Sequence, residues 1–127
     1  MAVAQNNQFT AIDFRYIKDD ALLGNNERSN AFGTTGKLYA IFLDNTTGSA
    51  SASAYLKLFD TAATVVGGTT VPDFEFRFDN TATLHSWTFP EGLTFSNGFG
   101  YTASTGAGTT KGGNLAAVIK SLIFVFK

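Results

Sequence analysis

Apolar residues in this chain recur at every second position, which is the period of a β-strand with one buried face. Three stretches show the alternation most clearly: Phe74, Phe76 and Phe78; Ile12, Phe14 and Tyr16; and Leu122, Phe124 and Phe126. In the first two stretches, charged residues occupy the positions between the apolar ones. We therefore expect three strands, each with these apolar side chains on a buried face.

Residues 38–43 read Leu-Tyr-Ala-Ile-Phe-Leu, an almost unbroken apolar run. This pattern predicts a strand that is central in its sheet and covered on both faces. Residues 9–17 and 115–126 are each expected to be strand-like, and further short strands are expected at 54–59, 84–89, 93–95 and 100–104. About eight strands with little or no helix predict an all-β sandwich or barrel.

The composition is that of one packed domain covering residues 1–127. Hydrophobic residues make up 44% of the chain and include 13 Phe, so there is ample apolar area to bury. The 9 basic and 10 acidic residues are sparse and balanced, which leaves no broad basic surface, and nucleic acid is not an expected partner. Because there is no Cys, disulfides and thiolate metal sites are excluded.

The chain shows no sequence signal for a membrane or for export. Its first residues lack the basic and apolar regions of a secretory signal, and no apolar run reaches the roughly 20 residues that span a bilayer. We therefore expect a soluble protein made in the cytoplasm of its host, with no membrane partner.

Candidate catalytic groups are few. His85 is the single His, and its neighbour Ser86 would point to the opposite face of a strand. Residues 33–37, Gly-Thr-Thr-Gly-Lys, lack the spacing of a phosphate-binding loop. An oxygen-rich stretch without EF-hand spacing is expected to form a solvated loop; it consists of Asp19, Asp20, Asn25, Asn26 and Glu27. The sequence therefore predicts no enzyme, no metal site and no cofactor.

The aromatic residues are the remaining candidates for a functional site. Trp and Tyr are favoured where a large apolar body is buried and a polar group stays in water. Phe9, Trp87, Phe89 and Tyr101 are the candidates for a subunit interface or for a ligand platform on which a sugar ring stacks. Burial in the core is the alternative for the strand aromatics.

Three segments carry a resemblance to a known group of proteins. They are residues 38–46 (LYAIFLDNT), 54–60 (AYLKLFD) and 89–105 (FPEGLTFSNGFGYTAST), followed by a Gly/Thr-rich loop and an apolar terminal strand. In this order they resemble small virion structural proteins of tailed bacteriophages. The resemblance covers residues 37–127, and residues 1–36 are unmatched.

The resemblance implies a jelly-roll-like antiparallel β-sandwich that assembles as a homotrimer on the capsid surface. It implies a capsid decoration, or cement, protein that clamps neighbouring major capsid subunits and stabilises the shell. The unmatched N-terminal segment would either complete its own sandwich or add a strand to a neighbouring subunit. The alternative is a tail or baseplate component, including a receptor-binding module that binds glycans.

Overall fold

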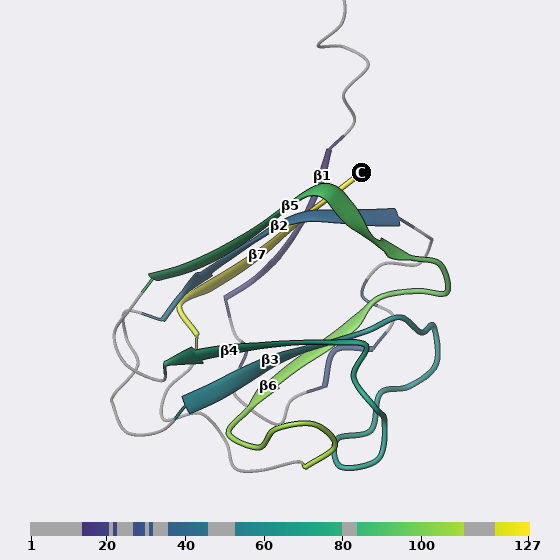
Figure 1. The fold of residues 1–127 in the computed structure, drawn as a ribbon, viewed down its shortest axis with the longest axis vertical. Helices are drawn as coiled ribbons and strands as arrows, with labels where there is room; N and C mark the ends of the chain where they lie inside the picture. Colours follow the sequence, from purple (N-terminus) through teal and green to yellow (C-terminus); the bar gives the residue numbers. More distant parts are fainter. Residues whose placement is uncertain are drawn as a thin grey trace, which may run out of the picture.

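The computed structural model describes residues 14–20, 22, 27–29, 31, 36–45, 53–79, 84–110 and 119–127. In these residues, seven strands form two antiparallel sheets that pack face to face, and there is no helix (Figure 1). The strands are β1 (Arg15–Asp19), β2 (Gly36–Asp44), β3 (Ser53–Phe59), β4 (Phe74–Asp79), β5 (Leu84–Phe95), β6 (Gly100–Ser104) and β7 (Ser121–Phe126). The predicted all-β sandwich is confirmed.

The strand order identifies the type of sandwich. One sheet has the order β1-β7-β2-β5 and the other β4-β3-β6. Beside β6, Arg28 forms an isolated antiparallel bridge with Tyr101. When the Arg28 segment is counted as the second of eight strands, the two sheets have the orders 1-8-3-6 and 2-7-4-5, the arrangement of a jelly roll.

Strand β5 corrects the prediction of two strands at 84–89 and 93–95. It is one strand with extra residues in the middle, because Leu38 pairs with Leu93 whereas Ala40 pairs with Thr88. Gly92 has a φ of 75°, and a Cβ there would lie 3.2 Å from the Tyr39 ring. Pro and Gly mark a β-bulge here, although the same residues are typical of a turn.

The first and last described strands, β1 and β7, lie in the same sheet. Strand β1 pairs with β7 of its own chain, with Ile17 opposite Phe124, so the described part of the N-terminal segment completes its own sandwich. The predicted strand residues 9–13 lie outside the described residues. At the other end β7 begins only at Ser121, which corrects the predicted strand 115–126, since Ile119 and Lys120 are not in the strand.

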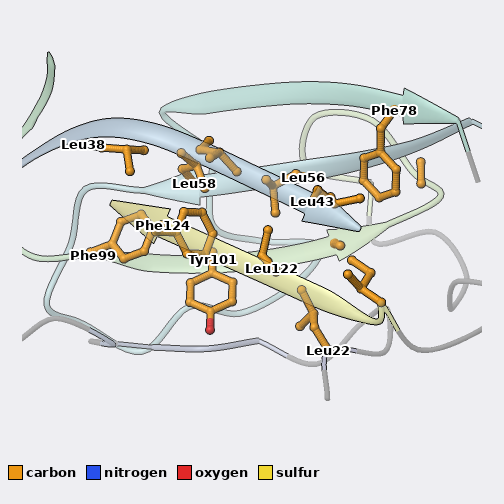
Figure 2. Close-up of a cluster of buried hydrophobic side chains, with 14 of the residues drawn as sticks. Leu22, Leu38, Leu43, Leu56, Leu58, Phe78, Phe99, Tyr101, Leu122 and Phe124 are labelled. Atoms are coloured by element: carbon orange, nitrogen blue, oxygen red, sulfur yellow. The ribbon is translucent and has the colours of Figure 1, made fainter. Parts of the chain in front are cut away.

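An aromatic cluster centred on Phe99 fills one end of the space between the sheets (Figure 2). The Phe99 ring centroid lies 5.0 Å from that of Phe95, 4.9 Å from Phe124 and 4.8 Å from Phe126. Tyr101, on the opposite sheet, lies 4.7 Å from Phe124. Leucines from β2 and β3 and Phe78 continue the core toward the other end.

Two predictions about buried faces are wrong for the single chain. Strand β2 is central in its sheet, as expected, but Phe42 is 46% exposed rather than covered. Phe14 and Tyr16, expected on a buried face, are 43% and 72% exposed. The register places Ile17 on the inner side of β1 instead. Phe14 and Tyr16 alternate with Ile17 along the strand, so they face outward.

Gly98 lies in the turn before β6, where the backbone packs closely against the loop after β3, and substituting it tests this packing. It has a φ of 153°, and a Cβ there would lie 2.6 Å from the backbone oxygen of Thr61. Because that neighbour is backbone, Gly98→Ala is expected to lower the free energy of unfolding by about 3 kcal/mol or more. Gly108→Ala is the control, since it has a φ of 57° but nothing within 4 Å, and it should cost about 1 kcal/mol. Chemical denaturation measures both, and equal losses would contradict this packing.

Candidate functional site

The outer face of sheet β1-β7-β2-β5 carries several of the large hydrophobic side chains that are exposed on the described surface, Tyr16, Phe42 and Leu84 among them. Directly paired residues point to the same side of a sheet. Tyr16 pairs with Val125, Val125 with Ala40, and Phe42 with Ile123. Their side chains, together with Leu84 at the end of β5, form a continuous surface that we call the outer apolar face. Tyr16 and Leu84 are each 72% exposed.

Two hollows lie on this face. The first is lined by Tyr16, Lys18, Phe42, Ile123 and Val125. The second is lined by Phe42, Leu43, Asp44, Leu84, His85, Ser86, Ser121 and Ile123. Because Phe42 and Ile123 line both hollows, they form a ridge between them. The face therefore presents one ridge with a hollow on each side of it.

The opposite sheet differs, because the chain covers much of its outer side with its own loops. Lys57 is 4% exposed, and its Nζ donates a hydrogen bond to the Thr110 carbonyl at 2.9 Å. Desolvation lowers the pKa of Lys57, and the carboxylate of Glu75 partly offsets this. Glu75 also accepts a hydrogen bond of 2.6 Å from the Gly108 backbone N–H. The cavity beside Lys57 measures only about 10 Å³, room for about one water.

Trp87 and Phe89 lie in the seam between the edge strands β5 and β4. The Phe76 ring centroid lies 5.3 Å from that of Trp87 and 5.6 Å from that of Phe89, and both residues are half-buried against the core. They thus close the side of the sandwich between these two strands. Phe9, the N-terminal candidate, lies outside the described residues.

Tyr101 corrects the prediction of an interface or ligand platform at that position. It is 3% exposed and packs in the aromatic cluster, so its ring offers no surface on which a ligand could stack. The core was the alternative for this residue, and the structure places it there.

His85 takes part in the seam. Its ring stacks on Trp87 at 5.8 Å with an interplanar angle of 10° and meets the edge of Phe78. Ser86 is exposed on the outer face of the sheet, on the opposite side from His85. No group of three His, Asp or Glu residues that could hold a metal occurs among the described residues.

A polar network of Asp19, Arg28 and Tyr101 joins the edge strand β1 to the Arg28 segment and β6. Asp19 Oδ2 accepts hydrogen bonds from the Tyr101 hydroxyl and from Arg28 Nε, each at 2.9 Å. Burial, followed by the hydrogen bond to Asp19, raises the pKa of Tyr101 far above its usual range. The hydrogen bond to Asp19 is also the main cause of the raised pKa of Arg28. The network fastens the Arg28 segment to β1 and β6.

Asp19 and Glu27 correct the prediction of a solvated loop. Asp19 is buried, and Glu27 accepts a hydrogen bond of 2.9 Å from the Gly67 backbone N–H. Asp20 is exposed, as expected, and Asn25 and Asn26 lie outside the described residues. No local pattern signals the contact of Asp19 with Tyr101, because 82 positions separate the two residues.

Comparison with protein-family models, with curated proteins and with solved structures found no match. The described part of the chain has no helix long and apolar enough to cross a membrane.

The Asp19 network predicts how stability changes at alkaline pH. Below about pH 10 the Tyr101 phenol is protonated in both the folded and the unfolded chain. Above about pH 10 the phenol ionises in the unfolded chain but stays protonated in the folded chain. Stability should therefore fall as pH rises above about 10, and Tyr101→Phe should reduce this slope. At pH 7 the variant should lose about 2 kcal/mol, because a hydrogen bond to a charged group is removed. Denaturation from pH 7 to 11 measures both effects, and identical slopes would contradict the proposed coupling.

Proposed function

We propose that this chain is a structural protein of a tailed-bacteriophage particle, specifically a capsid decoration protein that clamps neighbouring major capsid subunits and stabilises the shell. The observation that carries the proposal is the jelly-roll sandwich, whose outer apolar face on β1, β7, β2 and β5 offers a surface for assembly. A protein whose work is adhesion requires such a surface on a rigid support.

The fold supports this class of protein. Jelly rolls are found in viral capsid proteins, and also in lectins and cupins, so the strand order alone does not select among them. The resemblance of residues 37–127 to small virion proteins favours the first group. The proposed location is the capsid surface.

Clamping by a homotrimer would depend on multivalency. A trimer that touches several capsid subunits gains avidity beyond that of any single contact, provided that its subunits hold a fixed geometry. The Phe99 cluster and the loops fastened over β3 supply rigidity within each subunit.

The titratable groups of the described chain favour a structural role over catalysis. Asp19 and Arg28 join β1 to the Arg28 segment, while Glu75 and Lys57 bind the backbone of Gly108 and Thr110. Acid–base catalysis requires groups that converge on a space where a substrate fits. Instead, these side chains bind segments of their own chain.

The tail or glycan-binding alternative depended on exposed aromatic rings. Tyr101 is in the core and Trp87 is half-buried against Phe76, so neither of these two candidates supports a sugar-stacking platform. The exposed rings of Tyr16 and Phe42 were not predicted platform residues, and the resemblance of residues 37–127 is what favours the capsid over the tail.

Electron cryomicroscopy of the particle that carries this chain tests the proposal. The expected result is density for the sandwich on the icosahedral shell, at sites shared between neighbouring capsid subunits. Particles that lack the chain should release their DNA at a lower temperature, and adding the purified protein back should restore the original temperature. Density confined to the tail, or absence of the chain from the particle, would overturn the proposal.

A further inference from the structure

We infer that the outer apolar face is the surface through which copies of this chain join to one another. The occupant of the face is a second copy of the same chain, seated with its own β1-β7-β2-β5 sheet against the first. The inference rests on only one part of the proposed function, that copies of the chain assemble with one another. It does not depend on whether the chain belongs to a bacteriophage capsid.

The apolar pattern of the central strands favours a cover on the outer face that the described residues do not provide. Strand β7 has Leu122, Phe124 and Phe126 in the core, yet it also places Ile123 and Val125 on the outer face. Near-continuous apolar strands are typical of sheets buried on both sides. The chain covers much of its other sheet with its own loops, whereas Phe42 and Tyr16 stay exposed. The missing cover is therefore a second molecule.

The size of the face fits a reversible contact between copies. Four strands about 4.8 Å apart and about five residues long give roughly 300 Å² in projection, and about twice that as accessible surface. Two such faces in contact would bury on the order of 1,200 Å², the lower end of the range for specific interfaces. Self-association is thus expected to depend on concentration.

The shape of the face is suited to its own copy. The ridge of Phe42 and Ile123 lies beside the hollow that Tyr16, Lys18 and Val125 complete. The ridge of one copy can enter the hollow of another, which is the self-complementarity that identical subunits require. A reciprocal contact, with each ridge in the partner's hollow, closes a dimer, whereas a one-way contact, with the ridge of each copy in the hollow of the next, closes a trimer.

The charges on the face also favour a copy over other partners. Lys18 lines the first hollow and Asp44 lines the second, so the face carries both signs. Chains of formal net charge −1 repel each other little. A lipid surface with anionic head groups would instead require several cations around the apolar centre.

The test compares particle mass in solution for the wild type and matched variants. The double variant Phe42→Thr, Ile123→Thr places a residue of high strand propensity at both positions but removes the ridge. The control is Val71→Thr, because Val71 is 70% exposed on the loop before β4, away from the face. Sedimentation velocity from about 1 to 200 µM should show two or three chains per particle for the wild type and the control. The double variant should remain a single chain or show a dissociation constant at least about tenfold higher.

A second double variant distinguishes loss of the contact from misfolding as the cause of lost self-association. Tyr16→Ser with Leu84→Ser removes two side chains that are mostly exposed, so little packing within the chain is lost. Circular dichroism checks the fold of both double variants, and both should lose self-association. A wild type that stays a single chain at the highest concentration would overturn the inference. An assembly that survives in both double variants would also overturn it, because the contact would then lie elsewhere.

The outcome separates this inference from the proposed function. A dimer lost on removal of the ridge would support the face as the contact and contradict the proposed trimer. A face-dependent trimer that is absent from the capsid would support the inference and overturn the proposed function.

Discussion

The packing of aromatic rings around Phe99 is the interaction on which the rest of this structure depends. Phe99 precedes β6, and its ring meets Phe95 from β5 and both Phe124 and Phe126 from β7. Aromatic pairs with centroids about 5 Å apart in edge-to-face geometry stabilise beyond their buried area. The cluster joins the two sheets at the Phe126 end of β7, whereas Asp19 pairs with Leu122 near the other end of that strand. Tyr101 links the cluster to the Asp19 network, so the cluster fixes how the sheets face each other. The sandwich would have no common core at the Phe126 end without it.

This core also determines which side of each strand is left exposed. Once Phe124 and Phe126 pack inward, the register of β7 sends Ile123 and Val125 outward, and β1 and β2 follow in the same register. The outer apolar face is therefore a direct consequence of the core packing. In physical terms, the described part of this sheet carries more apolar surface than one layer of core can bury, and the inferred cover is a second molecule.

The alternation of Phe74, Phe76 and Phe78 was sufficient to predict a half-buried strand, and β4 confirms it. The central place of residues 38–43 was likewise predictable, since an apolar run of that length fits the middle of a sheet. Which face of residues 14–19 is buried was not predictable, because alternation defines two faces but not the register with a strand a hundred residues away. The bulge at Gly92 was missed because Pro and Gly signal turns and bulges alike. The role of Asp19 was missed because its partner Tyr101 is distant in sequence and depends on the folded sandwich.

The most direct test of the account is the accessibility of the outer apolar face itself, measured by hydroxyl-radical footprinting across a concentration series. The account predicts that Tyr16 and Phe42 become several-fold less reactive as the protein is concentrated, while exposed Val71 keeps its reactivity. Unchanged reactivity of Tyr16 and Phe42 at all concentrations, or protection confined to the loop around Val71, would contradict the central claim that a second copy covers this face.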